Sequence, residues 1–225
     1  MGIVSSFLFG NKKKEPKEHP LYPTLPSGIR LNGLIEFKPS CQSYFLLNES
    51  KMAVKVPDVD KCVVNAISSF RLFDIDIQRA YLDAHNPETI LQFHCTGGEI
   101  LDCILFNQTN KIILDSRESR LEWDKIIGFK DITTPTGFAY DREWMADLSE
   151  YGDFVTPLRF EEKYFTEQTT YVPVMNRAML YSRILEGGNP EDIEYLLVSL
   201  RTGIERERVE IWVGTVINIS QLNII

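Results

Sequence analysis

The chain has 225 residues and a mass of 25.9 kDa, with 44% hydrophobic and 25% charged residues. This composition is typical of a globular soluble protein, and it excludes a collagen-like, disordered or membrane-spanning chain. The 24 basic residues are outnumbered by 32 acidic residues, so the net charge is −8. An acidic surface repels phosphates, and we therefore expect no nucleic-acid partner.

The cysteines and the hydropathy pattern indicate a compartment. Cys41, Cys62, Cys95 and Cys103 form no Cys-x-x-Cys motif, so we expect reduced thiols in a cytoplasmic protein, with no metal site and no cofactor. No apolar stretch approaches the roughly 20 residues that cross a bilayer. The N-terminus also lacks the order of regions found in a signal peptide.

The N-terminal segment differs from the rest of the chain. Residues 1–9 form an apolar arm, and a basic and then proline-rich linker follows over residues 10–27. Four lysines against two glutamates give residues 1–27 a charge of +2, which leaves −10 for residues 28–225. Apolar side chains and nearby lysines together hold a segment on an anionic membrane. The predicted membrane-contact residues are Ile3, Val4, Phe7, Leu8, Phe9, Lys12, Lys13 and Lys14.

Two other interpretations of this arm stay open. Met1-Gly2 with Ser6 matches the N-myristoylation pattern, in which the lysines supply the second membrane signal. Alternatively, the arm docks onto the protein's own body or frays. The prolines at 16, 20, 23 and 26 favour an extended linker between arm and body.

The body, residues 28–225, has the alternating pattern of β-strands. Gly97-Gly98 predicts a hairpin turn. One helix is predicted after residue 118, where Ser119 and Glu122 form a capping box and Gly128 ends the segment. Strands are predicted over residues 31–37, 44–47, 73–78, 90–95, 100–106, 154–160, 171–185, 193–200 and 209–217. The strands at 193–200 and 209–217 are apolar on both faces, which indicates central positions in a sheet or barrel.

The two halves of the body share a pattern. The first half contains Arg79-Ala80, followed by an Asn-Pro pair and then a Thr-Gly pair. The same three pairs occur in the same order about 100 residues downstream, beginning at Arg177-Ala178. This similarity indicates either a duplication or two similar meanders. The predicted fold class is α+β, predominantly antiparallel β in a sheet or barrel-like meanders, with a few short helices. Two similar subdomains, about 28–115 and 150–225, would be joined by a helix and loops.

The sequence carries few candidates for chemistry. Asp74 and Asp76 lie two positions apart and could share a cation or a proton, and His94 could meet Cys103 across a hairpin. The blander interpretation is a solvated pair of carboxylates and a buried histidine. Phosphate loops, nucleophile elbows and zinc motifs are absent from the sequence.

Aromatic residues beside charges offer a different function, the binding of a protein partner. Trp123, Phe129, Tyr140 and Trp144 lie in a segment predicted as helix and loops, and Trp and Tyr are common anchors of interfaces. Alternatively, the two tryptophans close one end of a β core.

Several segments along the chain resemble the YjfK family of uncharacterised bacterial proteins. They are LFGNKKK (8–14), LPSGIRLNGLIE (25–36), YLD (81–83), WDKIIG (123–128), MLYSR (179–183) and EYLLVS (194–199). The resemblance implies no catalytic residue. It implies a bacterial origin, which removes the myristoylation interpretation, and a role in envelope stress or membrane maintenance beside a phage-shock-protein A-like membrane protein.

These patterns together predict a non-catalytic accessory or adaptor protein that is peripheral to the inner membrane. The alternative is an enzyme that modifies a small molecule or peptide at a site including Asp74, Asp76 or His94.

Overall fold

The computed structural model describes residue 25 and residues 28–57, 61–83, 88–145, 152–167, 169–188, 191–203 and 206–225. The predicted membrane-contact residues of the arm and nearly all of the linker lie outside this part of the chain.

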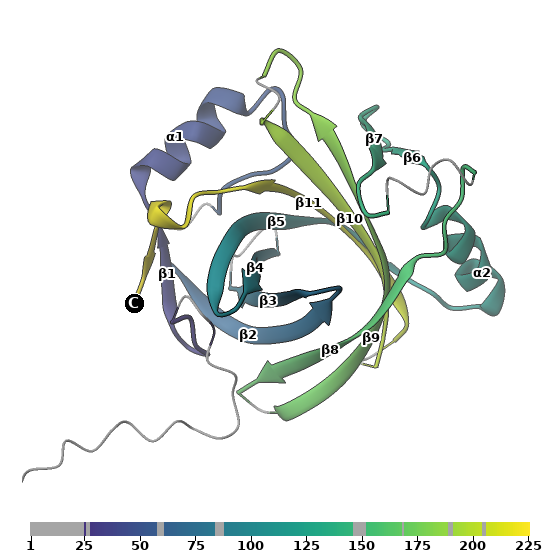
Figure 1. Ribbon diagram of the computed structural model, residues 1–225, viewed down its shortest axis with the longest axis horizontal. Coiled ribbons are helices and arrows are strands. Elements are labelled where there is room, and N and C mark those ends of the chain that lie inside the picture. The colour runs from purple at the N-terminus through teal and green to yellow at the C-terminus, as the bar shows by residue number, and fades with distance from the viewer. Residues whose placement is uncertain are drawn as a thin grey trace, which may run out of the picture.

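Eight antiparallel strands close into a barrel (Figure 1). Closure depends on β8, which pairs with β9 on one side and with β2 on the other. The order around the barrel is β2-β3-β4-β5-β11-β10-β9-β8. The strands are Lys61–Leu72 (β2), Ile75–Leu82 (β3), Thr89–Thr96 (β4), Glu99–Ile113 (β5), Leu158–Thr166 (β8), Thr169–Ile184 (β9), Ile193–Thr202 (β10) and Arg208–Val216 (β11). The predicted, mainly antiparallel β fold is confirmed.

The remaining elements lie outside the barrel wall (Figure 1). One group pairs with or lies near the start of β2, and the other follows β5 and pairs with β9. The first group is Leu34–Phe37 (β1), Pro39–Asn48 (α1), the short 3-10 helix Ile219–Gln221 and Leu222–Ile224 (β12). The second is Arg117–Ile126 (α2), Asp131–Thr133 (β6) and Ala139–Arg142 (β7).

Each half of the body contributes a four-stranded meander to this one barrel. The meanders join where β5 pairs with β11 and where β2 pairs with β8. The repeated Arg-Ala pair is not placed equivalently: Arg79 bonds Glu162 inside the barrel, whereas Arg177 forms an ion pair with Asp124 of α2 on the outside.

The larger apolar core covers the outer face of the wall. Alternate residues such as Leu91 on β4, Leu105 on β5 and Val198 on β10 point outward, and they pack beneath the added elements. From α1, Phe45 enters this core, and from β7, Tyr140 does so. The four cysteines are buried free thiols. Among the described residues, no helix is long and apolar enough to cross a membrane.

Three predicted strands differ from the structure. The strand predicted over residues 154–160 begins only at Leu158 and continues to Thr166. Residues 44–47 belong to α1, which begins at Pro39, a residue whose fixed φ suits the first helical position. The strand predicted through Phe73 instead turns there, because Phe73 adopts a φ of 54° and links β2 to β3 with its ring exposed.

The turn and helix predictions fare better. Gly97 and Gly98 have φ values of 60° and 88°, as a tight hairpin requires, so that turn is confirmed. The helix α2 is present, but its cap is Ser116, whose hydroxyl accepts from the Ser119 amide. Ser119 is therefore the third helical residue and not the cap.

Candidate functional site

The barrel interior has an apolar part and a charged part. Next to the hairpin between β2 and β3, the inward side chains are apolar, and the rings of Phe70 and Phe160 stack at 4.3 Å. Toward the opposite end, where β3 ends at Leu82, charged and aromatic residues replace them. The candidate site lies at this charged end.

Glu162 on β8 is the centre of the charged part. Its side chain is fully buried, and its carboxylate accepts hydrogen bonds from four other strands of the barrel. The donors are Ser68 Oγ (2.5 Å), Tyr81 Oη (2.8 Å), Arg201 Nη2 (3.1 Å), Asn176 Nδ2 (3.1 Å) and Arg79 Nη1 (3.3 Å). Because these donors come from β2, β3, β9 and β10, they can only meet inside the barrel.

These neighbours decide the ionisation of Glu162. Burial by itself raises the pKa of a carboxyl group, but Arg201 and Arg79 and the hydroxyls of Ser68 and Tyr81 outweigh burial and lower the pKa of Glu162 to about 2. The same burial raises the pKa of Tyr81, so its hydroxyl keeps its proton and donates. Glu162 is therefore a carboxylate at neutral pH.

Glu210 on β11 is the second buried carboxylate of this end. It accepts from Arg208 Nε at 2.7 Å, from Arg201 Nη1 at 2.9 Å and from Trp212 Nε1 at 3.3 Å. Burial opposes its ionisation, but Arg201 and Arg208 lower its pKa. Arg201 thus links Glu162 and Glu210.

A cavity of about 190 Å³ opens beside this network. Its walls are Tyr81, Glu88, Lys111, Tyr164, Arg201, Arg208, Glu210 and Trp212. Three cations and two carboxylates line it, and Arg79 and Glu162 behind the wall raise the count to four cations and three carboxylates. Among the described residues of the wall and of the network behind it, cations therefore exceed carboxylates by one.

Two buried donors of this network have no hydrogen-bond partner in the described part of the chain. They are Arg201 Nε and Arg79 Nη2. An unpaired buried donor costs about 1–3 kcal/mol, so a water molecule or a ligand that accepts from it is favoured. Excess positive charge and unpaired donors together are the features of a site for an anion.

The sequence matches one known protein family. Residues 6–223 match the model of a protein family of unknown function, DUF2491. The chain belongs to this family. No curated protein and no solved structure shows significant similarity to the chain.

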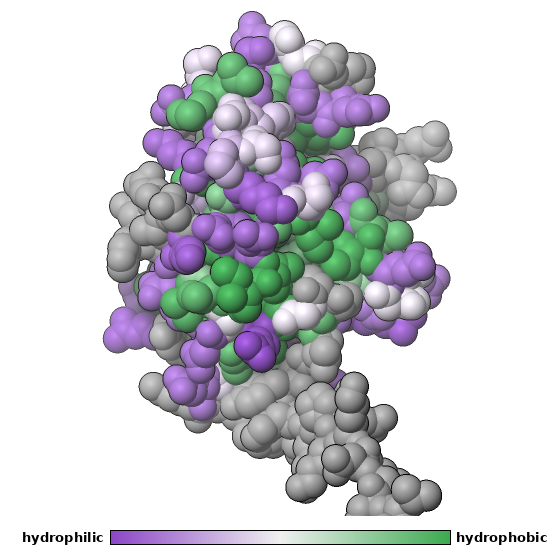
Figure 2. Space-filling model, turned by 90° about the vertical axis from the view of Figure 1, so that its left-hand side faces the viewer, coloured by the Kyte–Doolittle hydropathy of each residue, from purple (hydrophilic) through white to green (hydrophobic). Residues whose placement is uncertain are grey.

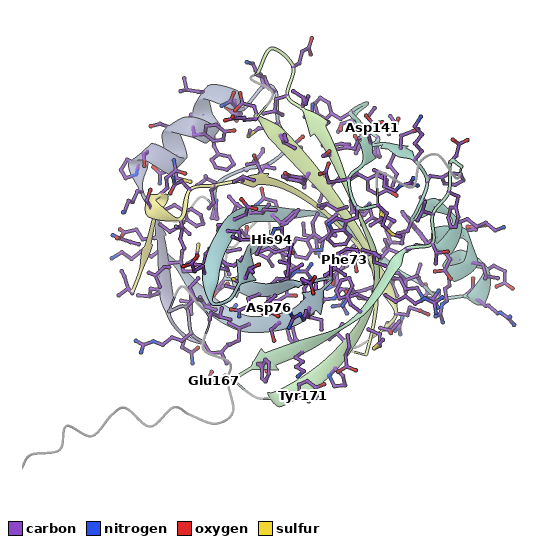
Figure 3. All side chains as sticks on the ribbon, in the orientation of Figure 1. Phe73, Asp76, His94, Asp141, Glu167 and Tyr171 are labelled. Atoms are coloured by element: carbon purple, nitrogen blue, oxygen red, sulfur yellow. The ribbon has the colours of Figure 1, made fainter. Side chains whose placement is uncertain are left out.

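The residues predicted for an enzyme site are not brought together. The register pairs Asp76 with Cys95 and Ile77 with His94, so Asp76 and His94 lie on opposite faces of the sheet. Figure 3 shows His94 within the ring of strands. Asp76 instead forms a 3.8 Å ion pair with exposed Arg71 on the outer face, and Asp74 lies exposed in the turn before it.

The predicted contact of His94 with Cys103 is also not formed. Cys103 lies opposite Phe93 and points outward, while His94 lies opposite Asp102. Burial raises the pKa of the Cys103 thiol, which therefore stays protonated. Burial lowers the pKa of His94, whose Nε2 lies 2.8 Å from Gln92 Nε2.

Among the described residues, no group of three His, Cys, Asp or Glu side chains could hold a metal.

The residues predicted for a protein partner separate by exposure. Phe129 is 45% exposed, whereas Trp123 and Trp144 are partly buried. Tyr140 is buried, and its hydroxyl donates to Glu194 at 2.8 Å, so it is a core residue and lies on no open surface.

Sequence analysis missed the charged end of the barrel. Its residues come from strands up to about 140 positions apart, and β10 is mainly apolar before Arg201, interrupted only by Glu194 and Ser199 after Ile193. A usable signal existed in β11. Arg208, Glu210 and Trp212 occupy alternate positions there and so lie on one face of a mainly apolar strand.

Proposed function

We propose that the protein is a non-catalytic binding protein whose barrel holds a small anionic ligand at its charged end. The observation that carries this proposal is the cavity lined by Lys111, Arg201 and Arg208, together with the unpaired buried donors of Arg201 and of Arg79 in the network beside it. Keeping charges in a protein interior is costly, and a bound anion offsets that cost.

The dimensions and walls of the cavity suit a limited class of ligand. Its 190 Å³ equals the volume of roughly six water molecules, enough for an inorganic phosphate or a short carboxylate. Lys111 stands exposed at the mouth, where it would attract an anion, while Tyr164 and Trp212 offer flat surfaces to an apolar part of the ligand.

The state of the acidic groups supports binding over catalysis. Both Glu162 and Glu210 are held as carboxylates by arginines and their acceptor sites are largely taken, so neither is poised to exchange a proton near neutral pH.

Titration calorimetry and tryptophan fluorescence with acetate, citrate and inorganic phosphate test the proposal. We expect saturable binding of at least one of these anions, with a change in the emission of Trp212. Lys111→Gln should weaken binding about fivefold or more, a change of about 1 kcal/mol or more. Lys163→Gln, an exposed lysine on the outer side of β8, is the matched control. Absence of binding for every anion, or equal affinity in the two variants, would contradict the proposal.

A second proposal is the accessory role that the sequence predicts, an adaptor peripheral to the inner membrane that serves envelope stress through a phage-shock-protein A-like partner. It is supported by Phe129 and Phe154, both nearly half exposed, whose rings pack edge to face at 5.9 Å beside α2. Binding of a purified phage-shock-protein A-like protein from the same bacterium should weaken in Phe129→Ser but not in Leu101→Ser, an exposed leucine on β5. No binding, or equal binding by both variants, would contradict the adaptor role.

A further inference from the structure

The helix α1 has an unusual surface for a helix on the outside of a protein. Its ten residues include no charged side chain, and its apolar residues do not gather on one face. Phe45 packs into the core, yet Leu46 and Leu47 are 72% and 81% exposed. A helix that is apolar on several sides is normally covered on all of them.

A groove continues this apolar surface. It has a volume of about 410 Å³ and lies between α1 and the segment that follows it. Its apolar walls are Phe45, Leu46, Met52, Val54, Val56 and Pro57. Figure 2, which looks onto the side of the molecule that carries α1 and β1, shows apolar surface gathered between polar areas.

The segment after α1 is fixed firmly to the barrel. The buried carboxylate of Glu194 accepts from the amides of Ala53 and Val54 at 2.5 and 3.2 Å. Arg183 Nη2 donates to the carbonyl of Lys51 at 2.7 Å. These bonds hold the base of the groove in place, so the two exposed leucines are presented by a rigid support.

The segment that contains α1 has a net charge of the opposite sign to that of the whole protein. Residues 38–57 contain Lys38, Lys51 and Lys55 against the single acid Glu49, although the chain has a net charge of −8. Lysines beside exposed leucines attract anionic headgroups while the leucines enter the acyl region.

We propose that α1 and its groove form a docking site for an anionic lipid surface, with Leu46 and Leu47 inserted among the lipids. The local positive charge favours this occupant over a second copy of the chain, because two like-charged copies would repel each other across the contact. This site is separate from the cavity in the barrel and does not depend on a ligand there.

Flotation of the full chain with vesicles tests this site. Vesicles of phosphatidylcholine with 30% phosphatidylglycerol are compared with vesicles of phosphatidylcholine alone. We expect the wild type to float with the anionic vesicles. The partition coefficient of the double variant Leu46→Ser, Leu47→Ser should be lower by about tenfold or more. Leu101→Ser, Leu121→Ser, which removes two exposed leucines elsewhere, is the matched control and should float like the wild type.

Three outcomes would overturn the proposal. The first is equal flotation of the wild type and the Leu46, Leu47 variant, which would leave any lipid binding to the N-terminal arm. The second is flotation that is independent of phosphatidylglycerol. The third is light scattering that shows a dimer in the wild type and a monomer in the Leu46, Leu47 variant, which would assign α1 to contact between copies. Circular dichroism of the variant establishes that it folds.

Discussion

The two faces of the barrel wall differ in the residues that they bury. The outer face carries the larger apolar core, which α1, β1 and β7 cover, and the inner face places a network of charges at one end of the barrel. Two fully buried carboxylates show the contrast. Glu194, outside the wall, binds Arg183 and the amides after α1 and so fastens one segment to another. Glu162, inside, lies among two arginines beside a cavity.

The two faces differ in what their buried charges contribute. A buried ion pair adds little stability over well-packed apolar residues, so stability alone does not explain the charges on the inner face. Charges kept inside at such a cost indicate a purpose other than stability. We therefore assign the proposed ligand to the inner face, and the proposed contacts with a partner or a membrane to the outer elements.

The largest effect is expected when the inner network loses its central charge. Glu162→Gln leaves Arg79 and Arg201 buried with too little negative charge, and breaking such a pair costs about 3–5 kcal/mol of unfolding free energy. Urea denaturation measures this loss. Glu161→Gln, the exposed neighbour on the same strand, should cost less than about 1 kcal/mol. A small effect at Glu162 would mean that the inner network tolerates its loss.

Acid should weaken the inner face in a defined range of pH. The pKa of Glu162 is about 2 in the folded protein and has its ordinary value in the unfolded chain, so its contribution is complete above the ordinary value. The contribution is lost as the pH falls from about 5 toward 2. Melting temperatures of the wild type should fall over this range more steeply than those of Glu162→Gln. Parallel curves would contradict the assigned role of Glu162.

A smaller and local effect is expected on the outer face. Glu194→Gln removes the charge that pairs with Arg183 and places an amide against the donors of Ala53 and Val54. Arg183 keeps its hydrogen bond to the carbonyl of Lys51 and its place over the ring of Phe138, so we expect a loss of about 1–3 kcal/mol, which is smaller than at Glu162. Hydrogen exchange should become faster in residues 46–57 and remain unchanged in β4 and β5. Uniformly faster exchange across the barrel would show that the two faces are not separable in this way.

The fold was more predictable than the site because strands obey local rules. The alternation in β9 and the apolar runs of β10 and β11 identify strands and their central position, and Gly97-Gly98 identifies a hairpin. The turn at Phe73 carries no such signal, because an aromatic residue with a positive φ is rare. The helix α1 was missed since its four apolar residues at 44–47 resemble a short strand.

The charged end could not be predicted because barrel closure creates it. Glu162, Arg201 and Arg79 are distant in sequence, and each of them alone resembles a solvent-facing residue of a strand. The pairing of β8 with β2 and of β2 with β3 brings Arg79 to Glu162, and the pairing of β9 with β8 and β10 brings Arg201 to it. The predicted residues Asp74, Asp76 and His94 are closer in sequence, yet Asp76 lies on the outer face of the sheet and His94 on the inner face.

Anomalous diffraction from crystals grown in sodium bromide will show whether an anion occupies the cavity at the charged end, as we propose. We predict a bromide peak within contact distance of Arg201 or Lys111 inside the cavity, and its loss in Lys111→Gln or in competition with the tightest-binding anion. Bromide peaks confined to the outer surface, with an empty cavity, would contradict the claim.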